Sequence, residues 1–372
     1  MKLKNELYQL QLSAIRAYTN LANRTPGCIK LTIGEPDFDT PESIKAAAMK
    51  ALEQGATHYA PNQGLLSLRQ AIAQKETARG YSCGPEQVLV TVGATGALYT
   101  ALTGILEPGD QVIVPQPAFP LYESITVAAG GQVVALDISK TDFQIRELEI
   151  TPKTKAIVLN SPNNPSGTVL SRESLETVKK AVKGKDIWII CDNVYNGLCD
   201  GPVYDLSLDP ELKDQVLVCQ SFSKPYAMTG WRVGFLAGPE QIIKRLLLLH
   251  AAQVAAVPTF IQEAAVVALD TDVSYMNEAY SSRRTLLCRR LRQMGIGFPE
   301  PKGAFYVLAD IRKFQMDSGT FCERLIKEGG VAAVPGSCFG AEGFVRFSCA
   351  CSELQLIDAM DRLESFIKKE SE

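Results

Sequence analysis

Residues 221–234 read Ser-Phe-Ser-Lys-Pro-Tyr-Ala-Met-Thr-Gly-Trp-Arg-Val-Gly, and they decide how the rest of the chain is interpreted. An apolar run lies on each side of this stretch, which predicts a buried strand before it and another after it. The ammonium of Lys224 is costly to bury there unless it is paired or chemically changed. Ser221 and Arg232 flank the lysine with a hydroxyl donor and a planar cation, the two groups that a bound phosphate needs.

Two interpretations of Lys224 compete. It is either an ordinary basic residue on a surface loop, or it condenses with the aldehyde of pyridoxal phosphate (PLP) to give a Schiff base. An isolated Ser-x-x-Lys favours the first interpretation, because short motifs often occur by chance. Arg232 within Gly-Trp-Arg-Val-Gly, eight residues further on, favours the second. The stretch therefore predicts PLP as cofactor.

The composition excludes several classes of function. The chain has 372 residues, 46% of them hydrophobic and 21% charged, which is typical of a globular protein with room for two domains. A net charge of −3 offers no basic surface to nucleic acid or an anionic membrane, and no apolar run is long enough to cross a bilayer. Ten cysteines without a Cys-x-x-Cys pair and only two histidines argue against a disulfide scaffold and a metal centre. With no apolar signal-peptide core at its start, the chain is expected to be cytoplasmic, without nucleic-acid, membrane or metal partners.

Strands and helices alternate through the middle of the chain. Apolar strand candidates lie at residues 111–115, 132–136, 156–160, 187–191, 216–219 and 233–237. This alternation predicts an α/β fold with a mostly parallel central sheet covered by helices on both faces. After about residue 270 the rhythm changes, which predicts a smaller α+β domain. We therefore expect a large domain over residues 36–270 and a small domain formed by residues 1–35 and 271–372.

The first 54 residues carry two helix predictions. Apolar residues at helical spacing predict one amphipathic helix over residues 3–23. Thr40-Pro41 has the composition of an N-cap and a first helical position, so a second helix is predicted from there to about residue 54. The intervening Gly34-Glu-Pro36 segment cannot continue a regular element. It is either a plain turn or a loop whose Gly34 amide approaches a substrate.

Several polar residues come directly after predicted strands. Ligands of parallel sheets bind beyond the carboxyl ends of the strands, so Asn164, Asp192 and Lys224 are expected to share one cleft. PLP withdraws electrons only while its pyridine nitrogen stays protonated, which requires an ionised carboxylate beside that nitrogen. Asp192 is the candidate for this carboxylate. The alternative is a strand-ending aspartate that caps the next turn.

Other groups of the cofactor need partners as well. Tyr195 and Asn164 are candidate donors to its phenolate oxygen, and Phe119 is a candidate for stacking on its ring, with a place in the core as the alternative for Phe119. The turn at Gly93 lies between a predicted strand and a predicted helix, a geometry that points amide N–H groups at an anion. This turn alone is weak evidence.

Arg346 is the candidate for binding the α-carboxylate of an amino acid. It is the single charged residue in the apolar run Phe344-Val-Arg-Phe347, where an unpaired guanidinium is expensive to bury. A forked pair between arginine and a carboxylate fixes the orientation of the bound molecule. A salt bridge within the protein is the alternative.

Together these residues resemble the class I/II aminotransferases, which are fold-type I PLP-dependent enzymes. The motifs that carry the resemblance follow the family's order: Leu31-Thr-Ile-Gly-Glu-Pro36, Tyr59-Ala-Pro-Asn-Gln-Gly64, Phe119, Asn163-Asn-Pro-Ser-Gly167, Asp192 with Tyr195, Ser221-Phe-Ser-Lys224, Arg232 and Arg346. The resemblance covers nearly the whole chain. It implies a fold-type I architecture and transfer of an amino group from an L-amino acid to a 2-oxo acid.

The resemblance also implies roles in the reaction. Lys224 holds the Schiff base and, once released, shuttles the proton between Cα and the cofactor. Asp192 pairs with the pyridinium nitrogen, and Tyr195 and Asn164 contact the phenolate oxygen. Phe119 stacks on the ring.

The same resemblance implies how the two ends of the ligand are held. The phosphate contacts are Ala94, Thr95, Ser221 and Arg232. The α-carboxylate contacts are Arg346, Asn164 and the Gly34 amide. Tyr59 acts across a subunit interface in the family and reaches the phosphate of the neighbouring site, which implies a homodimer with two shared sites.

The substrate is less sharply implied. Residues 12–18, 31–38 and 334–337 look most like bacterial aromatic and N-acetyl-diaminopimelate aminotransferases, which implies an aromatic or long acidic amino donor with 2-oxoglutarate as acceptor. Some aspartate-preferring relatives carry a lysine at the position of Thr95, so its absence argues against a strict aspartate preference. Asn193 stands where most relatives have glutamate, a position that does not contact the cofactor.

Two other functions use the same residues. A PLP-dependent β-carbon–sulfur lyase shares the lysine and the carboxylate and differs in the fate of the carbanion. A non-catalytic PLP-binding regulator joins this fold to a DNA-binding domain, for which the roughly 30 residues before Gly34 are too few. Transamination is therefore the preferred hypothesis.

Overall fold

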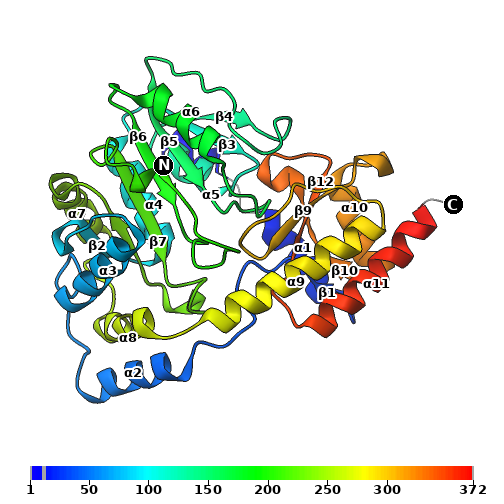
Figure 1. Ribbon diagram of the computed structural model, residues 1–372, viewed down its shortest axis with the longest axis horizontal. Coiled ribbons are helices and arrows are strands. Elements are labelled where there is room, and N and C mark those ends of the chain that lie inside the picture. The colour runs from blue at the N-terminus through cyan, green and yellow to red at the C-terminus, as the bar shows by residue number, and fades with distance from the viewer. Residues whose placement is uncertain (1, 11–13, 371–372) are drawn as a thin grey trace.

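The computed structural model describes residues 2–10 and 14–370 (Figure 1). Its largest element is a seven-stranded sheet of order β2-β8-β7-β6-β5-β3-β4. Its strands are β2 (Val88–Thr91), β3 (Gln111–Gln116), β4 (Gln132–Asp137), β5 (Thr154–Asn160), β6 (Trp188–Asp192), β7 (Val216–Ser221) and β8 (Gly234–Ala237). Neighbouring strands are parallel except where β8 pairs with β2 and with β7. The predicted mostly parallel sheet is confirmed.

Helices cover both faces of this sheet because its strands are apolar on both sides. Along β7, Val216 and Val218 belong to one hydrophobic cluster, while Leu217 and Cys219 belong to another, as the period of two in a strand requires. The first cluster includes residues of α2 (Glu42–Glu53), α3 (Leu66–Arg79), α6 (Arg172–Val182) and α8 (Thr259–Asp270). The second includes residues of α4 (Gly93–Ile105), α5 (Leu121–Ala128) and α7 (Glu240–Val254).

A smaller assembly contains the chain after about residue 273, together with α1 and β1. It has an antiparallel sheet of order β11-β12-β9 and a parallel pair of β1 with β10. These strands are β1 (Ile29–Lys30), β9 (Tyr306–Asp310), β10 (Val331–Ala332), β11 (Val334–Pro335) and β12 (Phe344–Ser348). The helices of this part are α1 (Ala14–Arg24), α9 (Ser274–Gln293), α10 (Ser318–Arg324), a π-helix (Leu325–Gly329) and α11 (Glu353–Glu370). Short 3-10 helices occur at Asn5–Tyr8, Pro85–Gln87, Leu206–Leu208, Thr229–Trp231, Arg312–Phe314 and Gly336–Phe339.

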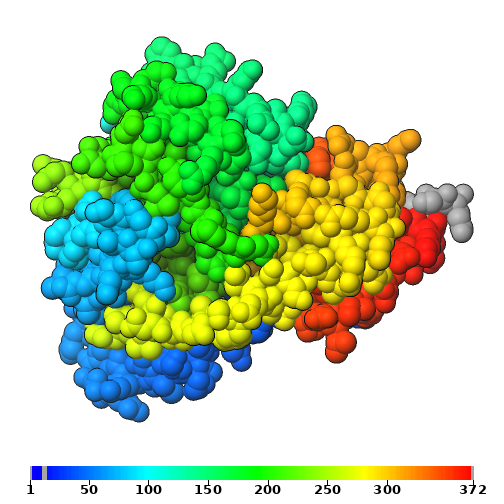
Figure 2. All heavy atoms as spheres, in the orientation of Figure 1, coloured from blue at the N-terminus to red at the C-terminus, as the bar shows by residue number. Residues whose placement is uncertain are grey.

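The α8 and α9 helices connect the two assemblies. In the space-filling view they form a yellow band that crosses from the green and blue part to the orange and red part (Figure 2). The strands and helices after residue 270 confirm the predicted change of texture, while the division into domains at residues 36 and 270 stays a prediction. Within the described ranges, no helix is long and apolar enough to span a membrane.

The helix predicted over residues 3–23 is only partly present. Asn5–Tyr8 form a 3-10 turn, α1 begins at Ala14, and residues 11–13 of the prediction lie outside the described residues. The 3-10 turn has no buried residue. A short helix that buries none of its side chains is marginal in water. Apolar residues at α-helical spacing are therefore not sufficient to make residues 5–8 part of an α-helix.

The N-cap predicted at Thr40 is wrong. The helix that follows, α2, begins at Glu42 without a side-chain cap. The Thr40 hydroxyl instead donates to the Ala227 carbonyl at 2.6 Å and accepts from Trp231 Nε1 at 3.0 Å. The Thr40 side chain therefore binds the loop after Lys224 and does not form the helix cap that the local sequence predicts.

Candidate active site

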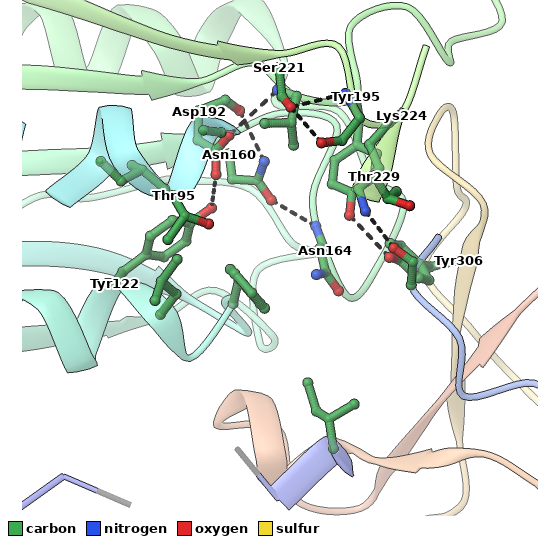
Figure 3. A pocket seen from close by; sticks show the side chains of 18 of the residues that line it. Thr95, Tyr122, Asn160, Asn164, Asp192, Tyr195, Ser221, Lys224, Thr229 and Tyr306 are labelled. Carbon is green, nitrogen blue, oxygen red and sulfur yellow. Dashed lines mark hydrogen bonds between the residues drawn. The ribbon is translucent and has the colours of Figure 1, made fainter. Parts of the chain in front are cut away.

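The carboxyl ends of the parallel strands meet at one edge of the seven-stranded sheet. Asn160 ends β5, Asp192 ends β6 and Ser221 ends β7. Because β8 runs antiparallel to β7, its first residue lies at the same edge, and Arg232 two residues earlier lies there too. A pocket forms at this edge, and residues of the smaller assembly, including Tyr306, line its other side (Figure 3). Arg346 belongs to the same lining.

Every predicted site residue except Tyr59 lines this pocket. The predicted residues that it brings together are Gly34, Ala94, Thr95, Phe119, Asn164, Asp192, Tyr195, Ser221, Lys224, Arg232 and Arg346. Tyr59 is 93% exposed and borders a separate hollow with residues 256–260. A single chain therefore brings all the predicted site residues together except Tyr59, which was predicted to act from a second subunit.

Several lining residues were not predicted. The polar ones are Tyr122, Asn160, Ser223, Thr229 and Tyr306, and the apolar ones are Ile15, Leu98, Leu121 and Val194. Asn160 had a signal in the sequence, because it opens the Asn-Ser-Pro-Asn-Asn segment. Tyr122 belongs to the first turn of α5, three residues after the predicted Phe119. Tyr306 had no comparable signal, because an uncharged aromatic residue within an apolar run has the pattern of an ordinary core residue.

Asp192 is a buried carboxylate, and burial raises its pKa to about 6. Its Oδ2 accepts the Tyr122 hydroxyl at 2.5 Å, and its Oδ1 accepts the Val194 amide at the longer distance of 3.4 Å. The alternative that Asp192 caps the next turn thus explains only the longer hydrogen bond, from the Val194 amide. Among the described residues no ion pair reaches this carboxylate, so its negative charge is available to a cationic group of a ligand.

Lys224 extends from the loop after β7, and its Nζ donates to the Gly34 carbonyl (Figure 3). Burial, together with the positive charges of Arg346 and Arg232, lowers the pKa of its amine to about 8, against the opposing effect of Glu35. A lowered pKa increases the fraction of neutral amine near pH 7, and the neutral amine is the form that attacks an aldehyde.

An anion-binding cradle forms where α4 begins. Gly93, its first residue, has φ +64°, and a Cβ there would lie 2.8 Å from Arg232 Nη2, so the close approach of the guanidinium requires glycine. Ser221 Oγ donates to Ser223 Oγ at 2.8 Å and accepts the Ser223 amide at 3.0 Å. A helix N-terminus, two hydroxyls and a guanidinium at one place have the chemistry that a phosphate needs.

Arg346 is 2% exposed and lies in the middle of β12. Its Nη1 donates to Asn164 Oδ1 at 2.9 Å and its Nη2 donates to the Thr32 carbonyl at 2.8 Å, while its Nε has no partner. No described carboxylate forms an ion pair with it, so the salt-bridge alternative is wrong. Burial lowers the pKa of this guanidinium. A buried cation with an unsatisfied N–H fits a ligand carboxylate.

An asparagine pair connects the two charged ends of the pocket. Asn160 Nδ2 donates to the Asp192 carbonyl at 3.0 Å, and Asn160 Oδ1 accepts the Asn164 amide at 2.8 Å (Figure 3). Because Asn164 Oδ1 accepts from Arg346, its Nδ2 is the donor that this side chain offers to a ligand. The site is therefore held together by hydrogen bonds that run from Asp192 to Arg346.

Residues 26–363 match the family model described as aminotransferase class I and II. The chain belongs to this family. It is 39% identical to a probable N-acetyl-LL-diaminopimelate aminotransferase of Bacillus subtilis, over 98% of this chain and 95% of that protein. It is 38% identical to aromatic-amino-acid aminotransferase 2 of Thermococcus litoralis, over 99% of each chain. The crystal structure of aspartate aminotransferase from Thermotoga maritima superimposes with a TM-score of 0.93 at 37% identity, covering 98% of this chain and 100% of that one.

The protein is thus a PLP-dependent aminotransferase of fold type I that acts on amino acids and 2-oxo acids. Its pocket fits the cofactor chemically: a buried carboxylate without an ionic partner, a lysine of lowered pKa and an anion cradle lie together. The relatives are aminotransferases, which favours transamination over the lyase and the regulator. Their names state three different amino donors.

Proposed function

We propose that this aminotransferase takes the amino group from an aromatic L-amino acid and passes it to 2-oxoglutarate. The observation that carries the choice of donor is the apolar part of the cleft wall, to which Ile15 and Leu121 contribute in addition to Phe119, the residue proposed to stack on the cofactor. An aromatic side chain gains free energy by leaving water for such a wall.

The cations of the pocket support the same choice. Among its described lining residues they are Lys224, Arg232 and Arg346, and each is needed for the cofactor or for the α-carboxylate. None of them is left to pair with a second carboxylate, so this chain's pocket favours a donor without one, and the distal carboxylate of 2-oxoglutarate would need a partner outside these lining residues. Thr95, in the position where some aspartate-preferring relatives carry a lysine, adds only a hydroxyl.

Four residues are proposed to act on the reacting centre. When bound, PLP supplies an electron sink for the negative charge that develops at Cα of the amino acid. Lys224 anchors the aldehyde and later moves the proton at Cα, and Asp192 keeps the pyridine nitrogen protonated. Tyr195 and the Nδ2 group of Asn164 donate to the phenolate oxygen.

The remaining predicted residues are proposed to hold the two ends. Ala94, Thr95, Ser221 and Arg232 hold the phosphate. Arg346 holds the α-carboxylate, with Asn164 beside it and the Gly34 amide facing it. Phe119 stacks on the ring. In support, all of these residues line one pocket, in which Arg232 lies against Gly93 and Arg346 is bonded to Asn164.

A long acidic amino acid is the second candidate donor, because the Bacillus subtilis relative is named for N-acetyl-LL-diaminopimelate. The acceptor 2-oxoglutarate is proposed from the resemblance to the family. One experiment distinguishes the two candidate amino donors.

The test is the visible spectrum of the PLP-loaded protein, recorded while single amino acids are added without a 2-oxo acid. Phenylalanine or tyrosine should bleach the yellow band at micromolar to millimolar concentration, and 2-oxoglutarate should restore it. Bleaching by N-acetyl-LL-diaminopimelate alone would select the second donor. Release of pyruvate and ammonia without bleaching would overturn transamination.

We further propose a homodimer in which Tyr59 completes the phosphate site of the neighbouring subunit. An aromatic side chain that is 93% exposed, outside its own chain's pocket, supports this arrangement. Hybrid dimers test it: mixing inactive Lys224→Ala with weakly active Tyr59→Ala subunits should restore activity, because one site then has both residues. If Tyr59 acted within its own chain, each subunit of the hybrid would lack either Lys224 or Tyr59. No site would then hold both residues, and activity would not recover.

A cytoplasmic location is part of the proposal. All ten cysteines are free in the structure, which is typical of a reducing compartment. Fractionation of the source cell with an antibody to the chain would test it.

A further inference from the structure

Tyr306 is buried beside both halves of the site and has no role in the function proposed above. It is 1% exposed and begins β9. Its hydroxyl lies 3.0 Å from the Tyr195 hydroxyl (Figure 3). Its ring centre lies 4.4 Å from Cζ of Arg346. One side chain therefore touches the proposed cofactor donor and the proposed carboxylate ligand.

The β9–β12 pairing explains why Tyr306 reaches Arg346. Arg346 lies opposite Leu308, and Tyr306 is two residues before Leu308 on the same strand. Residues two apart point to the same face of a sheet, so the tyrosine ring lies diagonally against the guanidinium. Phe339 contributes a second ring, with its centre 4.9 Å from Cζ of Arg346. Two aromatic rings thus take the place of a carboxylate around this cation.

The loop at Gly34 is shaped around the Tyr306 hydroxyl. A Cβ on Gly34 would lie 2.9 Å from that oxygen, a distance at which one of the two must move. The Gly34 carbonyl in turn accepts from Lys224 Nζ. The sequence left open whether Gly34 belongs to a plain turn or to a loop that approaches a substrate, and the structure shows that the missing side chain makes room for Tyr306.

We propose that Tyr306 is a positioning residue with two separable actions: its ring orients Arg346 for the α-carboxylate, and its hydroxyl orients and polarises Tyr195 for the cofactor. This inference rests on the roles proposed for Arg346 and Tyr195. It joins β9, which carries no proposed catalytic residue, to the loop after β6, so the two walls of the pocket are held in one geometry.

The hydroxyl action has a direction. When Tyr195 donates its proton to the phenolate oxygen of the cofactor, Tyr306 must donate to the Tyr195 oxygen. Hydrogen bonds in series strengthen one another, so Tyr306 makes Tyr195 a better donor. A donor at the phenolate oxygen favours the form of the Lys224–cofactor linkage in which that oxygen carries the most negative charge, which is the unprotonated form. Tyr306 therefore lowers the pH at which the visible band of the loaded enzyme changes.

Three variants separate the two actions, and each is loaded with PLP before measurement. Tyr306→Phe keeps the ring and removes the hydroxyl, Phe339→Leu removes the other ring, and Tyr306→Leu removes both groups of Tyr306. The first readout is the pH midpoint of the visible band. The second is the dissociation constant of 3-phenylpropionate, a carboxylate without an amino group, measured by calorimetry.

We expect Tyr306→Phe to raise the spectral midpoint by about 0.3–0.7 pH units and to leave the dissociation constant within about twofold. Phe339→Leu should weaken 3-phenylpropionate about three- to tenfold without moving the midpoint. Tyr306→Leu should do both. If this last variant does not fold, Tyr306→Met, which also lacks the ring and the hydroxyl, takes its place, and an unchanged dissociation constant in a folded variant without the ring overturns the ring action.

An unchanged pH midpoint of the visible band in Tyr306→Phe overturns the hydroxyl action. If every variant changed the pH midpoint and the dissociation constant of 3-phenylpropionate to the same extent, the two actions of Tyr306 would not be separable. Failure of the underlying assignments looks different. In that case the wild-type protein itself would show no pH-dependent visible band, or Arg346→Ala would bind 3-phenylpropionate as tightly as wild type does.

Discussion

Two largely buried arginines in this molecule have opposite surroundings. Arg79, at the end of α3, forms ion pairs with Glu76 at 2.8 Å and Asp205 at 2.5 Å. Arg346 is surrounded by carbonyl and amide oxygens and two aromatic rings, and no described carboxylate pairs with it. Burial alone would lower the pKa of both guanidinium groups, but the carboxylates of Asp205 and Glu76 raise the pKa of Arg79, while that of Arg346 is lowered.

The difference teaches how to tell a structural charge from a functional one. A buried cation that has its counterions within the fold stabilises the fold. A buried cation without one costs free energy until a ligand supplies the counterion. Asn193 belongs to the first kind of cluster, because its Nδ2 donates to Asp205 Oδ2 at 3.1 Å. Asn193 therefore belongs to the Arg79 cluster.

The largest effect is expected from Arg346→Ala. It should lower kcat/KM for the amino donor about 10²–10⁴-fold, because the α-carboxylate loses a forked, desolvated partner. The same variant should lose less stability in urea than a variant that breaks an internal ion pair, since Arg346 has no counterion in the fold. Steady-state kinetics and urea unfolding of one preparation check both parts. A variant that is destabilised and still binds substrate normally would assign Arg346 to the fold.

Arg79→Met is the matched control. Removing the shared partner of Glu76 and Asp205 leaves two buried carboxylates, and the free energy of unfolding should fall by about 3 kcal/mol. KM for the amino donor should remain within about twofold. If Arg79→Met instead raised KM strongly while leaving the urea midpoint unchanged, the distinction between the two arginines would be reversed.

Asp192→Asn extends the comparison to a negative charge. Burial raises the pKa of this carboxyl from 3.8 to about 6, so between these values the native state holds a proton that the unfolded state has lost. The unfolding free energy of the cofactor-free protein should therefore fall as pH rises from about 4 to beyond 6, by about 3 kcal/mol in total.

In Asp192→Asn this fall should be absent, so at pH 8 the cofactor-free variant is expected to be the more stable protein, while its affinity for PLP drops. Urea unfolding of both proteins at pH 5 and pH 8 provides the comparison. If the unfolding free energies of wild type and Asp192→Asn changed equally with pH, ionisation of Asp192 would not be what destabilises the cofactor-free protein.

Tyr122→Phe should give the smallest effect. It removes the 2.5 Å hydrogen bond to Asp192 and makes ionisation of the carboxyl harder, since this bond favours the charged form. Affinity for PLP should fall about three- to tenfold, by the free energy of one such bond. Fluorescence titration of the cofactor-free variant measures it. Unchanged affinity would mean that the tyrosine only fills space.

The sequence allowed much of the site to be predicted because strand ends in a parallel sheet meet at one edge. Asn164, Asp192 and Lys224 were expected in one cleft from this rule alone, and they line one pocket. Arg346 was identifiable because a lone charge in an apolar strand is costly. These signals are local and chemical.

Other features required the tertiary structure. Tyr306 reaches the site through strand pairing between residues far from the lysine, which leaves no local trace. Thr40 was expected to cap a helix and bonds to the distant Ala227 carbonyl instead. The first helix was overextended, because periodicity over residues 3–23 does not reveal whether the apolar face has anything to pack against.

The most direct test of the proposed site is chemical trapping. The protein is loaded with PLP, reduced with borohydride, digested and mapped by mass spectrometry. The site proposed here predicts one stable pyridoxyl adduct, on Lys224, which disappears in Lys224→Ala. An adduct on a different lysine, or none in protein that has taken up the cofactor, would contradict it.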